Sequence, residues 1–215
     1  MDIVTGVGVL DKAVHVLRAV AERPLSLGGL QAETGLPRAT AHRLAVALEA
    51  HGLLRRDDEG RFDLGPELAA LGRAAAERFP LTGLALPALE ALRSATEESV
   101  QLFVREGGHR RCVVSLPSPH ALRWIVPEGV LFPLDVGSAG RVLSGEAVDG
   151  AWVESVEERE PGVASVSAPV VDADGSVVAA VSVSGPIDRL TRSPGERLGG
   201  PVVEAAATIS SALGT

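Results

Sequence analysis

Hydrophobic positions at the start of the chain recur at helical spacing. Between residues 9 and 22 they form a single stripe, made up of Val9, Ala13, Val16, Leu17 and Val20. A stripe of this kind predicts an amphipathic helix that packs against other elements. The dipeptide Arg23-Pro24 ends this helix, because a residue that precedes proline is disfavoured in the helical conformation.

Capping residues predict two further helices. Ser26 is placed to cap a short helix with the sequence SLGGLQAET, and Gly35 ends it. Pro37 suits the first turn of a third helix, which runs to about Ala50. Gly52 is placed as its C-terminal cap. The residues of the third helix that are expected to face inward are Ala41, Leu44, Ala45 and Leu48.

A hairpin and a connecting helix follow. In LLRRDDEGRFDLG, residues 53–65, two short runs with apolar residues flank acidic residues and Gly60, which predicts a β-hairpin. The alanine-rich segment PELAALGRAAAERF, which begins at Pro66, predicts a helix that connects two domains. We therefore expect a first domain over 1–65, a linker helix over 66–80 and a second domain over 81–215.

Short strand-like runs alternate with helices in the second part of the chain. Helices are predicted from Leu84 to Glu97 and from about Pro201 to Leu213, with a loop over 185–200. The strand-like runs are SVQLFVRE, RRCVVSL, LRWIVP, VASVSAPVVD and SVVAAVSVSG. The sequence DADG, residues 172–175, joins the last two as a hairpin. These elements predict an α+β domain of about 130 residues.

Composition limits the class of protein. Apolar residues make up 46% of the chain, which is enough for a core, yet no run of 18 apolar residues predicts a membrane span. The N-terminus lacks the pattern of a signal peptide. The single cysteine, Cys112, excludes an internal disulfide, and it is expected to be a small buried hydrophobic residue, with redox sensing as the alternative. We expect a cytoplasmic protein with no membrane partner.

Charge is distributed unevenly along the chain. The net charge of −8 divides into −1 for residues 1–65 and −7 for the rest. An acidic chain is a poor candidate for binding nucleic acid over its whole surface. Between Gly35 and Arg56, however, there are four arginines and one glutamate. Contact with DNA would be confined to this small cationic face.

Polar and basic residues are concentrated at the N-terminal end of the third predicted helix, where the helix dipole disfavours cations. Three helices followed by a hairpin describe a winged helix-turn-helix, which places the N-terminal residues of its second turn helix against base edges in the major groove. DNA phosphates would then supply the missing negative charge. The predicted DNA contacts are Ser26, Arg38, Thr40, His42 and Arg43, with Arg55, Arg56 and Arg61 at the hairpin. On spacing alone, a solvated arginine face on a small bundle explains these residues equally well.

The wording of several blocks resembles one known family. The segment LPRATAHRL, which begins at Leu36, has the L-[PS]-[KR]-x-T-x-x-R-L core of IclR-type bacterial transcriptional regulators. FPLDVGSAGRVLSG resembles the signature loop of that family, and EEREPGVASVSAPVVDADGSVVAAVSVSGPIDRLTR resembles its C-terminal block. The resemblance covers nearly the whole chain. The blocks are most similar to actinobacterial members linked to amino-acid biosynthesis, leucine in particular.

The resemblance implies a fold and a set of partners. The fold class is α+β: an N-terminal winged helix-turn-helix domain plus a C-terminal GAF-like α/β effector-binding domain, joined by a helix. Members of the family form dimers or tetramers and bind near-palindromic double-stranded DNA operators. Many repress and some activate, and small organic metabolites change their affinity for DNA. In this chain the mechanism would be a population shift between two placements of the paired wing domains.

The resemblance also implies a ligand cleft. The effector-binding residues carried over are Gly137, Ser138, Ala139 and Gly140 in the glycine-rich loop, Val163 and Ser165 on one strand, and Ser182 and Ser184 on the next. Successive loop amides can hold a carboxylate, and residues two apart on a strand face the same side. The alternative for the loop is a simple tight turn, and for the serines, small residues that let a helix pack closely.

One departure from the family pattern concerns the chain after the signature loop. Only EAVDGAW, Glu146 to Trp152, intervenes before the C-terminal block, where the family has a longer helical stretch. The effector domain is therefore expected to be shortened between 145 and 153. The pocket is then more open, completed by a partner subunit, or unable to bind ligand.

Other chemistry-bearing residues point to no reaction. The sequence has no nucleophile elbow, P-loop, paired catalytic carboxylates or metal-ligand spacing among its histidines, so we expect neither an enzyme nor a cofactor or metal. Trp124 and Trp152 are expected in the core, at an interface or at the pocket wall, and residues 157–160 at a solvated edge. A different class of function stays open: a metabolite-binding or oligomerisation module whose winged helix contacts protein instead of DNA.

Overall fold

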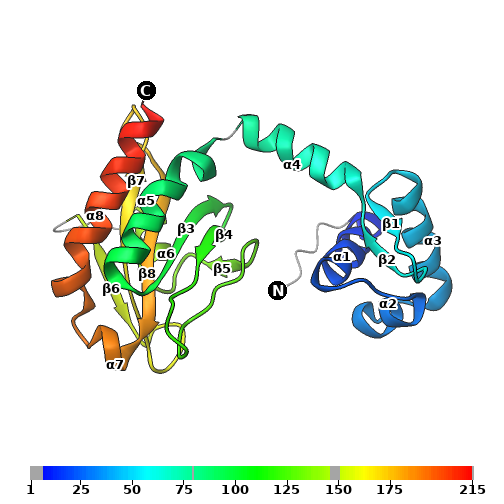
Figure 1. Ribbon diagram of the computed structural model, residues 1–215, viewed down its shortest axis with the longest axis horizontal. Coiled ribbons are helices and arrows are strands. Elements are labelled where there is room, and N and C mark those ends of the chain that lie inside the picture. Colours follow the sequence, from blue (N-terminus) through cyan, green and yellow to red (C-terminus); the bar gives the residue numbers. More distant parts are fainter. Residues whose placement is uncertain (1–6, 79, 146–150, 215) are drawn as a thin grey trace. The chain divides into compact units, whose positions relative to one another are not determined.

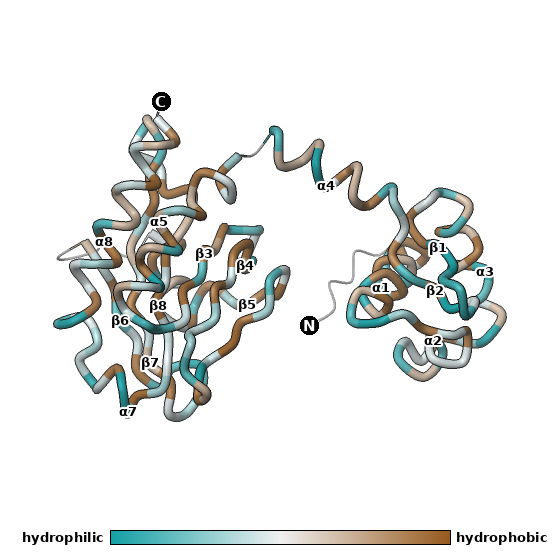
Figure 2. The backbone as a smooth tube through the Cα atoms, viewed as in Figure 1, coloured by the Kyte–Doolittle hydropathy of each residue, from teal (hydrophilic) through white to brown (hydrophobic). Residues whose placement is uncertain are grey.

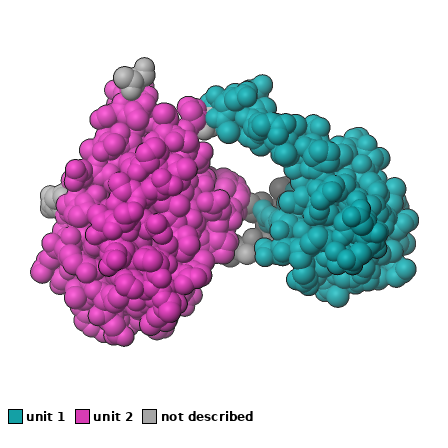
Figure 3. Space-filling model, in the orientation of Figure 1, with its two compact units in different colours: residues 1–79 teal, residues 80–215 magenta. Residues whose placement is uncertain are grey.

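The computed structural model describes residues 7–78, 80–145 and 151–214, and it divides the chain into two compact units. The first ends at residue 79 and the second begins at residue 80 (Figure 3). The expected linker helix therefore groups with the first unit and not between the two. The expected shortening between 145 and 153 concerns residues 146–150, which lie outside the described residues.

The first unit has the predicted order of helices and strands (Figure 1). Its elements are α1 (Gly8–Glu22), α2 (Leu27–Thr34), α3 (Arg38–Ala50), β1 (Leu54–Arg56), β2 (Phe62–Leu64) and α4 (Pro66–Arg78). Strands β1 and β2 pair antiparallel, and an isolated bridge from Leu25 to Phe62 adds a third short edge. The hydrophilic residues of the β1–β2 hairpin are teal in Figure 2. This arrangement is a winged helix-turn-helix.

Local chemistry accounts for the boundaries of these helices. The Ser26 hydroxyl accepts a hydrogen bond from the Gly29 N–H at 3.1 Å, which satisfies one of the free donors at the start of α2. Gly35 ends α2 with a φ of 65°, a left-handed conformation that glycine adopts without strain. Gly52, with a φ of 69°, follows the last turn of α3. These three positions fix the turn between α2 and α3.

The core of the first unit lies between the three helices and the hairpin. Its buried residues are Val16, Val20, Leu25, Leu30, Leu44, Ala45, Leu48, Leu54 and Phe62. All four residues predicted to face inward from α3 are buried. Val9 departs from the predicted stripe, since it is 66% exposed, and Leu10 beside it is 53% exposed. The start of α1 extends beyond the core of its own unit. No residue of α4 is buried.

The second unit is a six-stranded antiparallel sheet with helices on both faces (Figure 1). Its elements are α5 (Leu81–Thr96), β3 (Ser99–Glu106), β4 (His109–Leu116), β5 (Leu131–Pro133), α6 (Ser138–Leu143), β6 (Val153–Val156), β7 (Val163–Val171), β8 (Val177–Pro186), α7 (Ile187–Leu190) and α8 (Pro194–Leu213). The strand order is β5-β4-β3-β8-β7-β6. Helices α5 and α8 pack on one face over the larger core, and α6 packs on the other over a smaller core that includes Cys112.

Two predictions for the second unit are wrong. Residues 122–127 form no strand. The Ser99 hydroxyl donates to the Trp124 carbonyl across this loop, and prolines at 117, 119 and 127 interrupt any strand ladder. The last helix begins at Pro194, where 185–200 was expected to be a loop. The glycines that suggested a loop, Gly195 and Gly199, lie in the helix because Trp152 packs against them, and an added Cβ at either would overlap the indole ring.

Among the described residues, no helix is both long enough and apolar enough to span a membrane.

The Cys112 thiol is fully buried, and burial raises its pKa to about 12. A thiol disulfide reagent at pH 8 is expected to leave it unmodified in the folded protein, because the thiolate is the reactive form. In denaturant the same reagent should modify one thiol per chain, since Cys112 is the only cysteine. Absorbance of the released reagent measures both states. Stoichiometric reaction of the folded protein would support the redox-sensing alternative instead.

Candidate functional site

Helix α3 presents a basic surface opposite its buried face. Ala41, Leu44, Ala45 and Leu48 anchor the helix in the core. The predicted DNA-contacting residues fall on the remaining positions of its first two turns: Arg38, His42 and Arg43 are exposed and Thr40 is half-buried. Ser26 is exposed at the start of α2, and because it accepts from the Gly29 N–H, its own O–H proton is left for a further acceptor.

The two arginines of α3 are not neutralised by the protein itself. Among the described residues, no carboxylate forms an ion pair with Arg38 or Arg43. Arg38 donates one long hydrogen bond, 3.3 Å, to the Gln31 side-chain oxygen. Each guanidinium thus keeps most of its donors for an external partner, and the planar fork of arginine suits phosphate and the guanine edge.

The three arginines of the hairpin differ from those of α3, because each is held by carboxylates of the same unit. Arg55 pairs with Asp63 at 2.6 Å, and Arg56 lies 3.5 Å from Glu49 and over the Phe62 ring. Arg61 pairs with Asp57 at 2.7 Å and with Glu59 at 2.9 Å. The hydrogen bond from Arg61 lowers the pKa of Asp57. The prediction that these arginines follow phosphates therefore requires each to exchange an ion pair, which at an exposed site is worth about 0.2–1 kcal/mol.

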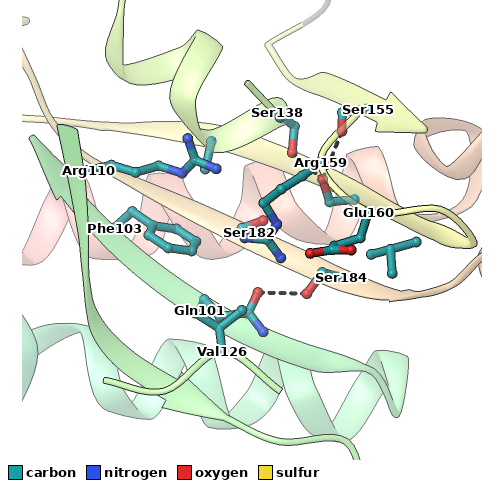
Figure 4. Close-up of a pocket in the computed structure, with 14 residues that line it drawn as sticks. Gln101, Phe103, Arg110, Val126, Ser138, Ser155, Arg159, Glu160, Ser182 and Ser184 are labelled. Atoms are coloured by element: carbon teal, nitrogen blue, oxygen red, sulfur yellow. Dashed lines mark hydrogen bonds between the residues drawn. The ribbon is translucent and has the colours of Figure 1, made fainter. Parts of the chain in front are cut away.

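A cavity lies in the second unit on the sheet face that α6 covers (Figure 4). Seven of the eight predicted effector-binding residues line it: Gly137, Ser138 and Ala139 from the loop and start of α6, Val163 and Ser165 from β7, and Ser182 and Ser184 from β8. Segments far apart in the sequence meet here because β7 and β8 are paired with Ser165 opposite Ser184. The structure thus brings these residues together, and ligand binding by them stays a proposal.

The serine hydroxyls form a hydrogen-bonded row along the cavity. Ser138 contacts the hydroxyls of Ser165 at 2.7 Å and of Ser167 at 2.8 Å. Ser184 donates to the Gln101 side-chain oxygen at 2.9 Å, which is drawn as a dashed line in Figure 4. Several of these polar groups are buried among apolar residues. Such a constellation can orient a small polar molecule.

The glycine-rich loop has a role that the sequence did not show. The Gly137 N–H, expected to receive a ligand carboxylate, donates to the Glu158 carboxylate at 3.0 Å. Gly140 does not line the cavity. An added Cβ there would overlap the Leu134 carbonyl and the Arg110 guanidinium, so the glycine permits close packing of α6. For Gly140 the tight-turn alternative is the better account.

Several lining residues were not predicted: Gln101, Phe103, Arg110, Val126, Ser155, Arg159 and Glu160. Arg159 and Glu160 belong to the segment expected at a solvated edge, and Arg159 reaches into the cavity (Figure 4). Gln101 carried a signal in the sequence, since it is a polar residue between Val100 and Leu102 in an otherwise apolar run. Arg110 and Arg159 carried none, because arginines beside turns are ordinarily exposed. Trp124 lies over Arg159 without lining the cavity itself.

The two unpredicted arginines dominate the electrostatics of the cavity. Burial lowers the pKa of Arg110 to about 10, and the neighbouring Arg159 charge lowers it further while Asp135 opposes the shift. Burial also lowers the pKa of Arg159. Both shifts mean that the cavity disfavours the positive charges that it contains. An anionic molecule would relieve this penalty.

A winged helix with unpaired arginines, together with a separate unit that encloses a polar cavity, defines a DNA-binding regulator. Residues 9–58 match the IclR helix-turn-helix domain, and residues 145–211 match the C-terminal domain of the bacterial transcriptional regulator IclR. Together these ranges cover more than half of the chain. The chain belongs to the IclR family of bacterial transcriptional regulators, and its relatives are regulators and not enzymes.

Individual relatives span almost the full length. The chain is 29% identical to the glycerol operon regulatory protein of Streptomyces griseus, over 95% of this chain and 96% of that protein. It is 26% identical to the HTH-type transcriptional regulator KipR of Bacillus subtilis, over 94% and 96%. A crystal structure of an IclR homolog complexed with 4-hydroxybenzoate from Microbacterium hydrocarbonoxydans has the same fold, with a TM-score of 0.78, 22% identity, and coverage of 95% of this chain and 98% of that one.

Proposed function

We propose that the first unit binds a near-palindromic operator, with α3 in the major groove of each half-site. The observation that carries this proposal is the pair of exposed guanidiniums, Arg38 and Arg43, which the described carboxylates leave unpaired. In this role Arg43 and Arg38 contact base edges or phosphates, and Ser26, Thr40 and His42 contact the backbone. Residues 1–65 are the DNA-binding domain, and 66–80 connect it to the effector domain, 81–215.

Binding to a two-fold operator requires two copies of the chain. The apolar residues Val9 and Leu10 at the start of α1 are 66% and 53% exposed, and pairing of two chains would bury them. A homodimer gives two recognition helices at the spacing of half-sites one helical turn apart. A tetramer would place two such pairs in one assembly.

The second unit, in this proposal, senses a small organic metabolite and changes operator affinity. Support comes from the cavity, in which serines, a glutamine and two arginines converge within an apolar domain. The similar structure that contains 4-hydroxybenzoate supports a ligand of this size class. The metabolite acts by population shift: it favours the placement of paired wings that fits the operator or the one that does not.

Genomic footprinting of the protein in its host tests the DNA-binding role directly. The expected result is a small set of promoters that share a two-fold sequence, and the genes they control identify the pathway, amino-acid biosynthesis or another. Operator affinity, measured on these sequences, should fall steeply as salt rises, because Arg–phosphate contacts release counterions. A flat salt response with no enriched promoters would favour the protein-contact alternative.

A further inference from the structure

Two guanidiniums share one aromatic ring in the effector cavity. The Cζ atom of Arg110 lies 5.4 Å from the Phe132 ring centroid, and that of Arg159 lies 4.4 Å from the same centroid. Arg110 also lies over Phe103 and Arg159 over Trp124, at 5.5 and 5.0 Å. Aromatic faces attract cations weakly and do not neutralise them. The positive charge in this corner is therefore held by rings and by burial, not by ion pairs.

Hydrogen-bond donors in the cavity are left over. Arg110 is 2% exposed and donates to the Pro133 carbonyl, yet its Nε–H has no acceptor among the described residues. The Gln101 side-chain nitrogen, on a residue 1% exposed, has none either. A buried donor without an acceptor is unfavourable and is rare in folded proteins. Both donors belong to residues that line the cavity. An acceptor-rich ligand would satisfy them.

The charges of the lining residues indicate how many negative charges the ligand carries. Arg110 and Arg159 are positive and Glu160 is negative, so the lining carries one net positive charge. Glu160 is exposed, and so is Asp135, the other carboxylate that acts on Arg110. Water screens both more effectively than it screens the buried guanidinium. One ligand carboxylate is the simplest complement to this set.

The size of the cavity indicates what must move. Its volume is about 30 Å³, close to the space of a single water molecule. Arg159 projects into it from the loop between β6 and β7, and its neighbours hold that loop in place. Glu157 pairs with Arg192 at 3.0 Å, and Glu158 pairs with Arg141 at 3.0 Å and accepts from the Gly137 N–H. The backbone is tied on one side of Arg159, while its side chain is held by aromatic contacts alone.

We propose that the effector is a small monocarboxylate bound jointly by Arg110 and Arg159, and that Arg159 leaves the faces of Trp124 and Phe132 to admit it. The inference rests on the proposed sensing role of the cavity and adds the ligand class and the two residues that select it. Arg110 is the fixed, buried anchor. Arg159 is the movable group that occupies the cavity before binding and closes on the carboxylate afterwards.

Matched acid and amide probes test the charge requirement. Titration calorimetry on the full-length protein would compare benzoate with benzamide and 4-hydroxybenzoate with 4-hydroxybenzamide, because each pair differs mainly in charge. A charge-assisted pair of hydrogen bonds predicts at least about tenfold tighter binding of the acid. Arg159→Gln should remove about this factor for the acids and change amide binding less than twofold. Arg197→Gln, an exposed arginine on α8, is the control for general charge loss.

Tryptophan emission tests the displacement. Both tryptophans lie in the second unit, and only Trp124 has Arg159 over its ring. Binding of the acid should change emission in the unmodified protein and not in Arg159→Gln. Equal affinity for acid and amide, or an Arg159→Gln variant with unchanged preference, would overturn the inference and leave the sensing role standing. If neutral and charged compounds alike fail to bind or to alter operator affinity, both fall.

Discussion

Replacement of Arg43 by alanine is expected to weaken operator binding by roughly 1–3 kcal/mol, about 5- to 150-fold. The side chain is exposed in the second turn of α3, on the face opposite Leu44 and Leu48. Its removal takes away an arginine that no described carboxylate neutralises, and it leaves the core intact. Fluorescence anisotropy on a labelled operator duplex measures the loss, and a scrambled duplex shows whether specificity falls with affinity.

Arg55→Ala is the matched control for this variant. It removes the same charge from the hairpin, but Arg55 already pairs with Asp63. The expected loss is below about 1 kcal/mol, because part of any phosphate contact is offset by the ion pair that must be broken. Equal losses for the two variants would show that charge alone governs binding and that the unpaired state of Arg43 has no special importance.

The second large effect is expected from Gly199→Ala, which should destabilise the effector domain by about 1–3 kcal/mol. A methyl group at this position overlaps the Trp152 indole, which packs across the glycines of α8. The gain in helix propensity from alanine, up to about 1 kcal/mol, is smaller than this overlap. Urea unfolding followed by tryptophan emission reports on this domain alone, because both tryptophans belong to it.

Gly83→Ala supplies a control of opposite sign. Gly83 is exposed on α5, and an added Cβ there meets no atom within 4 Å. This variant should stabilise the domain by up to about 1 kcal/mol. A double variant with Trp152→Leu should reduce the penalty of Gly199→Ala, since the ring that clashes is gone. If Gly199→Ala is neutral in both backgrounds, the packing of Trp152 on α8 is not tight.

Local sequence signals were sufficient to predict the first unit. Its helices are short, and their ends coincide with residues of strong conformational preference, Ser26, Gly35 and Gly52. The apolar stripe of α3 leaves only one face for the arginines. The exception, Val9, belongs to an apolar stripe that continues past the unit's own core, and periodicity does not reveal what covers such a stripe.

The second unit was harder to predict because long-range packing decides its details. Gly195 and Gly199 signal a break in any helix, and only the position of Trp152, more than forty residues earlier, explains why α8 continues through them. The cavity was found in part through the serines, whose spacing of two on β8 sets a common face. Arg110 and Arg159 escaped prediction, since burial of a guanidinium depends on aromatic partners from other segments.

The ion pairs of the hairpin have a consequence for how the regulator searches a genome. Non-specific retention on DNA grows with the number of phosphates that a protein neutralises. With Arg55, Arg56 and Arg61 engaged by neighbouring carboxylates and a net charge of −8, few cations are available for indiscriminate contact. Encounters with unrelated sequence should be brief, so that a small number of molecules per cell suffices to keep an operator occupied.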